Sequence, residues 1–245
     1  MPVEQIVAEI RASKKADYVG SASLLPAVDF VRDQGGDFIA EFATSISIGI
    51  ALPSAIVDLL PRRGERAVQV SYRSHAYDVI NQRLDILSSE IASALQMAGH
   101  KAFPIPASER VDDKRICASF SHKVAANLAG FGWIGKSCLL ITRKHGPRVR
   151  WATVLTDAPP GTMVEQLPDG CGTCTKCVDI CPVNAFTGRH FVAGEPRERR
   201  YAAEKCDKYF QEMEAQGDLK VCGMCLYVCP FGMSSISRKH GIEVK

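Results

Sequence analysis

Residues 171–182 read CGTCTKCVDICP, and this stretch decides how the rest of the chain is understood. Four cysteines in it are spaced C-x2-C-x2-C-x3-C and are followed directly by a proline. They are Cys171, Cys174, Cys177 and Cys181, with Pro182 after them. This spacing is typical of the thiolates that hold a [4Fe–4S] cluster, so the stretch predicts a protein that moves electrons.

A second run further along the chain, also followed by a proline, comprises Cys222, Cys225 and Cys229. It lacks a first cysteine, because Leu219 stands at that position. Eight of the ten cysteines in the chain lie between residues 171 and 229, and Cys206 is the one outside both runs. Two [4Fe–4S] clusters need about eight thiolates. We therefore expect two clusters, with Cys206 as the replacement ligand.

The two runs are expected to share their ligands. In two-cluster ferredoxins the cysteine before the proline ligates the other cluster. Applied to this chain, the first cluster is held by Cys171, Cys174, Cys177 and Cys229. The second cluster is held by Cys181, Cys206, Cys222 and Cys225. This crossed ligation predicts a compact C-terminal module that resembles bacterial ferredoxins.

Two zinc sites of four thiolates each are the alternative use of these cysteines. Zinc knuckles usually present well-separated C-x2-C pairs, whereas the first run has three cysteines within seven residues. Iron–sulfur clusters are therefore the favoured interpretation. Cys117 and Cys138 belong to neither cluster and are expected to be core thiols, with a place in the lining of an active site as the alternative for Cys117.

The composition is that of an ordinary globular protein. The chain has 245 residues, of which 46% are hydrophobic and 23% charged, and its net charge is only +3. This charge gives no case for nucleic-acid binding. The chain opens on an amphipathic stretch rather than a signal peptide, and its most apolar segment, 46–57, is broken by Gly49 and Pro53. We therefore expect a cytoplasmic protein without membrane contact, whose clustered cysteines bind metal.

A change in composition divides the chain. Residues 157–170 read DAPPGTMVEQLPDG, with three prolines and two glycines, as in a linker. We expect an N-terminal domain at residues 1–157, a linker at 158–170 and the double-cluster module at 171–245. Helix and strand patterns interleave in the first of these. The predicted fold class is α+β, with a mixed α/β N-terminal domain.

Apolar residues recur every three or four positions over residues 75–98, which predicts a long helix. Residues 3–15 show a shorter helical pattern. Serine alternates with isoleucine from Ser45, so residues 45–52 are expected to form a strand. Further strands are expected at 18–20, 102–106, 139–142 and 150–155, and a helix at 122–129.

A second motif lies between an alanine-rich helix and an apolar strand. It reads AGFGWIGK at residues 129–136. Closely spaced glycines let the backbone approach a large ligand. The candidates to bind a cofactor here are Gly130, Gly132 and Gly135, with Trp133 as an apolar wall and Lys136 as the partner of a phosphate or other anion. A tight turn around a core tryptophan is the alternative.

Together, this motif and the cysteine module resemble epoxyqueuosine reductase and its relatives, a superfamily that includes the reductive dehalogenases. The glycine motif, the stretch Asp157-Ala158-Pro159 and the order of the cysteines carry the resemblance, over about residues 70–232. It implies a cobalamin in the N-terminal domain beside two [4Fe–4S] clusters. A low-potential donor such as ferredoxin or flavodoxin would supply electrons to the cobalt, and the substrate would be a tRNA or a small molecule.

One departure from the family concerns the proton donor. Its members carry an aspartate in a D-[ST]-[AG]-P-x-x-E-R stretch, and aligning the end of that stretch with His122 and Lys123 puts Ile116 at the aspartate position. His122 and Tyr72 are the candidates to supply protons instead. The departure keeps an alternative open, namely a non-catalytic ferredoxin-like electron carrier or a reductive activator of a partner enzyme. A reductase that uses a flavin, or no organic cofactor, is a third interpretation.

Overall fold

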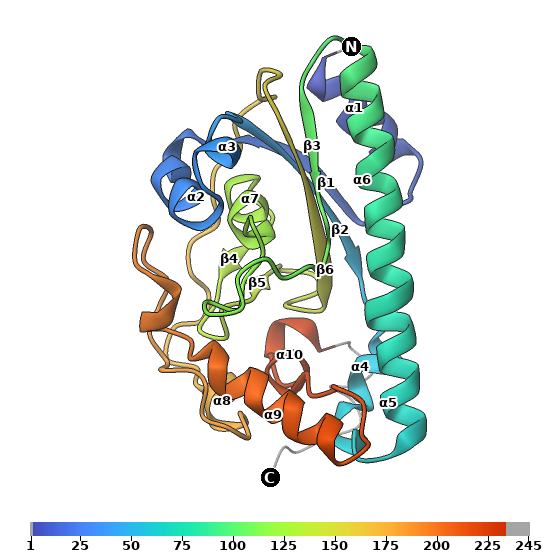
Figure 1. Cartoon of the computed structure of the whole chain (residues 1–245), viewed down its shortest axis with the longest axis vertical. Coiled ribbons are helices and arrows are strands. Elements are labelled where there is room, and N and C mark those ends of the chain that lie inside the picture. The colour runs from blue at the N-terminus through green and yellow to red at the C-terminus, as the bar shows by residue number, and fades with distance from the viewer. Residues whose placement is uncertain (1, 234–245) are drawn as a thin grey trace.

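The computed structural model describes residues 2–233, and an antiparallel sheet lies at its centre (Figure 1). Its strand order is β1-β2-β6-β3. The strands are β1 (Tyr18–Ser23), β2 (Thr44–Ala51), β3 (Ala102–Ile105) and β6 (Val149–Thr156). The central strands β2 and β6 are buried along almost their whole length, because helices cover both faces of the sheet.

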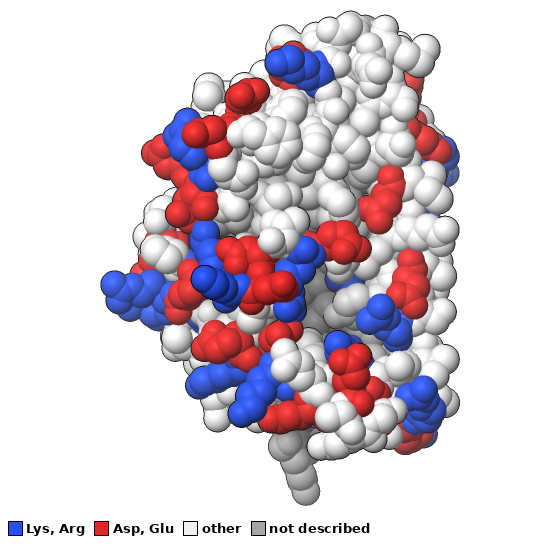
Figure 2. Space-filling model, in the orientation of Figure 1, with Lys and Arg blue, Asp and Glu red and all other residues white. Residues whose placement is uncertain are grey.

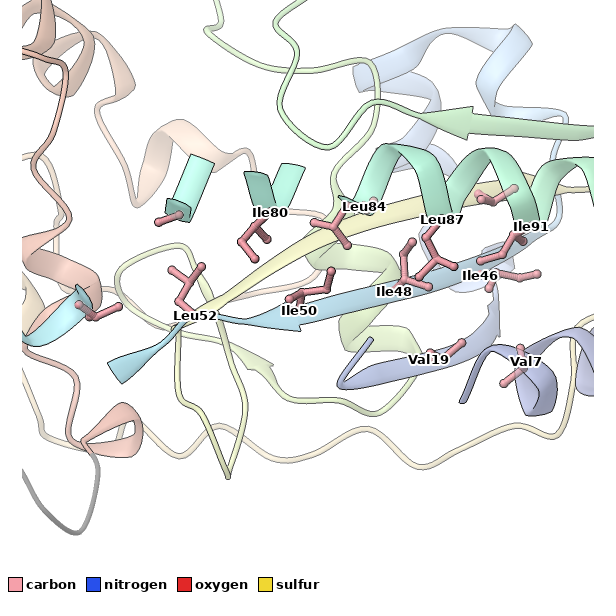
Figure 3. Close-up of a cluster of buried hydrophobic side chains, with 14 of the residues drawn as sticks. Val7, Val19, Ile46, Ile48, Ile50, Leu52, Ile80, Leu84, Leu87 and Ile91 are labelled. Carbon is pink, nitrogen blue, oxygen red and sulfur yellow. The ribbon is translucent and has the colours of Figure 1, made fainter. Parts of the chain in front are cut away.

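Helix α6 (Ile80–Met97) covers one face of the sheet (Figure 1). Its apolar residues at three- and four-residue spacing are buried and meet the isoleucines of β2 (Figure 3). They are Ile80, Leu84, Leu87, Ile91 and Leu95 in the helix and Ile46, Ile48 and Ile50 in the strand. The predicted long helix and strand are confirmed, although a π-helical segment, Arg73–Val79, precedes α6.

The opposite face of the sheet carries shorter helices. α7 (His122–Leu128) lies against β2 and β6, with α2 (Val28–Gly35) beside it (Figure 1). α7 leads into a hairpin of two short strands, β4 (Trp133–Ile134) and β5 (Leu140–Ile141). The other helices before the cysteine-rich part are α1 (Val3–Ala12), α3 (Asp37–Ala40), α4 (Ser54–Asp58) and α5 (Arg66–Tyr72), with 3-10 turns at Leu25–Ala27 and Leu60–Arg62.

The cysteine-rich part packs against the lower end of the sheet in Figure 1, beside α4 and α5. Its helices are α8 (Lys176–Asp179), α9 (Ala203–Ala215) and α10 (Met224–Tyr227), with 3-10 turns at Arg197–Arg199 and Pro230–Gly232. Val221 and Val228, which flank α10, belong to the same hydrophobic core as Val57 and Leu60. The two parts of the chain therefore share one core.

A buried ion pair strengthens this junction. Arg148, only 2% exposed, lies 2.7 Å from a carboxylate oxygen of Asp58 and also donates to the carbonyl oxygen of Tyr227 at 3.2 Å. The guanidinium thus joins the strand end, α4 and α10. Removal of the Asp58 carboxylate would leave the buried guanidinium of Arg148 without this ion pair, which is destabilising.

Residues 157–170 contain no helix or strand. They run along the N-terminal part, where the amide of Gly161 donates to Oγ of Ser21 at 3.2 Å. The boundaries of the predicted domains remain a prediction, and residues 234–245 of the predicted module lie outside the described residues. Among the described helices, none combines the length and the apolar character that crossing a bilayer requires.

Candidate metal centres

The four thiols predicted to hold the second cluster line one cavity of about 250 Å³. They come from separate segments of the chain and are Cys181, Cys206, Cys222 and Cys225. Burial raises the pKa of Cys206, Cys222 and Cys225, and charge repulsion from the neighbouring thiols raises it further. The fold therefore brings Cys206 together with the second run, although Cys206 lies sixteen residues before Cys222.

The four thiols predicted for the first cluster also form a group. Burial raises the pKa of Cys177 to about 11, and the thiols of Cys171, Cys229 and Cys174 contribute to this rise. The pKa of Cys229 is raised to about 11, first by burial and then by Cys171 and Cys174. Cys229, which closes the second run, is thus grouped with the first run, as the crossed scheme requires.

The two groups of thiols are neighbours. The pKa of Cys225, in the second group, is raised by the other thiols of that group and also by Cys177 of the first group. Within residues 2–233, no three histidine, cysteine or acidic side chains converge as ligands of a single metal ion. In a [4Fe–4S] cluster each cysteine binds a different iron, so that cluster ligands do not need to converge on one point.

The glycine motif packs against the first cysteine loop. Nε1–H of Trp133 donates to Sγ of Cys171 at 3.5 Å, and Nζ of Lys136 donates to the carbonyl oxygens of Gly172 and Cys174 at 2.7 and 3.1 Å. Lys136 is only 5% exposed, so its ammonium is committed to this loop. The side chains for which the sequence predicts cofactor contacts are thus in contact with the cysteine loop.

The motif's glycines allow close packing within the protein. A Cβ on Gly132 would lie 2.1 Å from the carbonyl oxygen of Ile141, and one on Gly135 would lie 3.2 Å from Sγ of Cys171. Gly130 has a φ of +74° and packs against Val164 of the segment after β6. The backbone of the motif is therefore closely packed, as the sequence predicts. The segments that it contacts are β5, the cysteine loop and residues 157–170. Contact with a cofactor remains a prediction for these five motif residues.

Arg150 and Tyr72 share the cavity of the second group of thiols. Tyr72 is 3% exposed, and burial raises the pKa of its hydroxyl strongly. Nε of Arg150 donates to the carbonyl oxygen of Ala76 at 2.9 Å, and its guanidinium stacks 3.6 Å from the ring centre of Tyr77. Nη2 of Arg150 is buried without a hydrogen-bond partner. Within the described lining of this cavity, Arg150 is the residue that carries a permanent charge.

Arg150 was not among the predicted site residues. The available signal is its position as the charged residue of β6, whose other residues are uncharged and mostly apolar. Its role depends on contacts with residues more than seventy positions away, which the local pattern does not reveal.

His122, a predicted proton donor, is hydrogen-bonded at both ring nitrogens. Nε2 lies 3.1 Å from the carbonyl oxygen of Pro106, which only accepts, so Nε2 carries the proton. Nδ1 lies 2.9 Å from Oγ1 of Thr153. Burial lowers the pKa of His122 to about 4, so the ring is neutral and Nδ1 accepts from the threonine hydroxyl. These contacts favour a structural role, and the catalytic role remains a prediction.

Comparison with known proteins agrees with this geometry. Residues 170–232 match the family model of a 4Fe-4S double cluster binding domain. An epoxyqueuosine reductase from Leadbetterella byssophila is 30% identical over 175 residues, which cover 71% of this chain and 53% of that protein. One from Bacillus anthracis is 32% identical over 147 residues, which cover 58% of this chain and 35% of that protein. The chain thus spans about half the length, or less, of the curated relatives it matches.

Solved structures of an epoxyqueuosine reductase and of a reductive dehalogenase share the fold of this chain. A crystal structure of epoxyqueuosine reductase superposes with a TM-score of 0.58 at 19% identity, covering 94% of this chain and 65% of that one. A reductive dehalogenase superposes with a TM-score of 0.65 at 20% identity, covering 92% of this chain and 31% of that one. The chain is therefore similar to epoxyqueuosine reductases over part of their length, and its residues 170–232 match a 4Fe-4S double cluster binding domain.

Proposed function

We propose that this chain is an iron–sulfur oxidoreductase in which two [4Fe–4S] clusters pass single electrons through the cysteine-rich part. The observation that carries the proposal is the grouping of eight thiols into two neighbouring sets of four, one of which lines a single cavity. A low-potential donor such as ferredoxin or flavodoxin is the proposed source of electrons.

The residues present fit such clusters. The cavity of the second group is walled by aromatic side chains, among them Tyr72, Phe186 and Tyr201, which limit the access of water. Burial raises the pKa of Cys225 and of Cys229, so these thiols must release protons as iron binds. When bound, each cluster takes up and releases one electron. Arg150 places a positive charge beside the second group, and Trp133 donates a hydrogen bond to the first.

A corrin is the electron acceptor that the relatives suggest, since the structure of the matching dehalogenase was described as suggesting a mechanism for B12-dependent dehalogenation. The two cavities that adjoin the glycine motif and the thiols have volumes of about 270 and about 250 Å³. Pockets for drug-sized ligands measure about 300–1,000 Å³, and a corrin is larger than such ligands. The residues as placed do not enclose a corrin.

Reduction of a modified tRNA is a second candidate function. It is favoured by the likeness to epoxyqueuosine reductase, one structure of which holds an epoxyqueuosine-modified tRNA stem loop. Ile116, at the position of the family's aspartate, has no acidic group and a φ of +53°. On the face shown in Figure 2, Lys and Arg are interspersed with Asp and Glu, so this face has no continuous basic stripe for an RNA backbone.

An anaerobic reductive titration tests the electron relay. Two one-electron clusters predict an uptake of about two electrons per chain, with an electron paramagnetic resonance signal from reduced clusters. Uptake of less than one electron would contradict the proposal. Addition of cobalamin to the same sample then separates the candidates. Retention of a corrin through gel filtration favours the corrin-dependent reductase, whereas full electron uptake without corrin retention favours the carrier.

A further inference from the structure

A cavity of about 270 Å³ lies between α2, α7, the β4–β5 hairpin and the loop that precedes α9. Its lining includes four cationic side chains and a single acidic one. The cations are Arg115, Lys123, Arg197 and Arg200, and the acid is Glu198. We call this space the basic cavity. None of the eight predicted cluster ligands lines it.

Lys123 is the cation with the fewest partners. Its Nζ donates to the carbonyl oxygen of Cys138 at 2.8 Å, and among the described residues no carboxylate lies within 4.0 Å of it. An ammonium has three donors, so two of them are left for a ligand. Burial lowers the pKa of Lys123, and the positive charges of Arg197 and Arg200 lower it further. Arg197 and Arg200 are thus close enough to Lys123 for their positive charges to act on it.

Arg200 is also incompletely satisfied. It is 4% exposed, its guanidinium lies 4.7 Å from the ring centre of Phe191, and Nη1 donates weakly to Sγ of Cys138 at 3.7 Å. Glu195 lies 4.0 Å away, beyond hydrogen-bond distance, and its other oxygen is bound by Arg189 at 2.8 Å. Nε of Arg200 is buried without a partner, which costs free energy.

The other two cations are partly neutralised. Arg115 forms an ion pair with Asp33 at 2.9 Å, and Arg197 forms one with Glu198 at 3.2 Å. Arg197 also donates to the carbonyl oxygens of Arg115 and Ile116, yet its Nε is buried without a partner. In the part of the chain that the structure describes, Lys123 is thus the cation of this lining that forms no ion pair, while Arg200 has only the long contact of 4.0 Å with Glu195.

The rest of the lining is largely apolar. Phe30, Phe120, Val124 and Ile134 contribute side chains to it, and Phe120 is 2% exposed. A fully hydrated inorganic anion would leave this surface unused, whereas an anion with an apolar body would cover it. The volume suits a small molecule.

We propose that the basic cavity binds a small organic carboxylate, whose head accepts hydrogen bonds from Lys123 and Arg200 and whose body packs on Phe120. The proposal does not depend on the electron relay, since the cavity contains no cluster ligand. The β4–β5 hairpin would separate such a ligand from the first group of thiols. Ile134 lines the cavity, while the adjacent Gly135 lies against Cys171 on the other side.

Calorimetry under anaerobic conditions, on the full chain with its clusters, tests the proposal. The probes are benzoate, the uncharged and equally large benzamide, and inorganic phosphate. We expect benzoate to bind about tenfold or more tightly than benzamide, because a charge-assisted hydrogen bond requires the carboxylate. Absence of benzoate binding, equal binding of benzamide, or tighter binding of phosphate would each overturn the proposal.

Variants locate the site. Arg200→Gln and Lys123→Gln should each weaken benzoate binding by about tenfold or more, since each removes one charged donor. Arg199→Gln is the matched control, because Arg199 is exposed and adjacent to Arg200 but does not line the cavity. Equal loss in the control would refute the assignment. If the buried Arg200 variant does not fold, Lys123→Gln decides the question.

Discussion

The indole N–H of Trp133 lies 3.5 Å from the sulfur of Cys171 and donates a hydrogen bond to it. Trp133 belongs to the glycine motif and Cys171 opens the first cysteine run. The two strongest signals in the sequence therefore meet at one contact. Hydrogen bonds to the sulfurs are among the factors that set the reduction potential of a cluster. If Cys171 holds a cluster as proposed, this contact predicts that Trp133 affects the reduction potential of that cluster.

Replacement of this donor should make the first cluster harder to reduce. We expect Trp133→Phe to keep both clusters but to lower the reduction potential of one, because the hydrogen bond stabilises the more negative reduced state. A tenfold change in a one-electron equilibrium corresponds to about 59 mV, and we expect a shift of this order in the reduction potential. A redox titration followed by electron paramagnetic resonance measures it. Trp151→Phe is the control, since Trp151 stacks on Phe131 in the core, and an equal shift there would contradict the account.

Arg150 should tune the second cluster. Its unpartnered Nη2 and its place in the lining predict that the guanidinium stabilises the additional negative charge of the reduced cluster. Arg150→Gln should therefore lower the potential of the second cluster by tens of millivolts, while Arg150→Lys should lower it less. The exposed Arg143→Gln serves as the comparison. An unchanged potential in Arg150→Gln, with both clusters present, would show that the charge does not act on the cluster.

His122 predicts a pH dependence of stability. Its pKa is lowered from the usual value near 6.5 to about 4 in the folded protein, so the unfolded chain binds more protons between these values. The stabilisation is fully present above pH 6.5 and is lost as the pH falls toward 4. Between pH 7 and pH 5 the free energy of unfolding falls by about 2 kcal/mol, because each pH unit below 6.5 costs about 1.36 kcal/mol.

Denaturant unfolding at the two pH values checks this prediction. The difference between pH 7 and pH 5 should be smaller in His122→Gln than in the unaltered protein, because glutamine does not titrate. Other titrating groups contribute equally to both proteins and cancel in the comparison. An identical pH dependence in the two proteins would show that His122 is not held neutral.

Much of the fold follows from local patterns. The alternation from Ser45 and the spacing from Ile80 to Leu95 identify β2 and α6, because side chains alternate between the two faces of a strand and return to one face of a helix every three or four residues. The cysteine spacing also predicts the ligand sets, and the structure places Cys206 in one cavity with Cys181, Cys222 and Cys225, although their role as ligands remains a prediction. Once three of the four ligands of the second cluster are assigned, few cysteines remain as candidates for the fourth.

The partners of individual side chains are less predictable. Glycines permit close approach to any neighbour, so the sequence does not distinguish a cofactor from the cysteine loop that meets Gly135. Arg150 contacts residues far away in the sequence, and its position in a strand does not indicate the cavity it lines. The basic cavity likewise joins α7 to residues beyond the second motif. Such contacts depend on how the shared core brings the two parts of the chain together.

The metal content of the anaerobically purified chain and of Cys206→Ser tests the central claim most directly. Two [4Fe–4S] clusters predict about eight irons and eight inorganic sulfides per chain, and about half of each in Cys206→Ser. Cys117→Ser, whose thiol belongs to neither group, should retain the full content. Stoichiometric zinc, about four irons or fewer in the unaltered chain, or full content in Cys206→Ser would contradict the account.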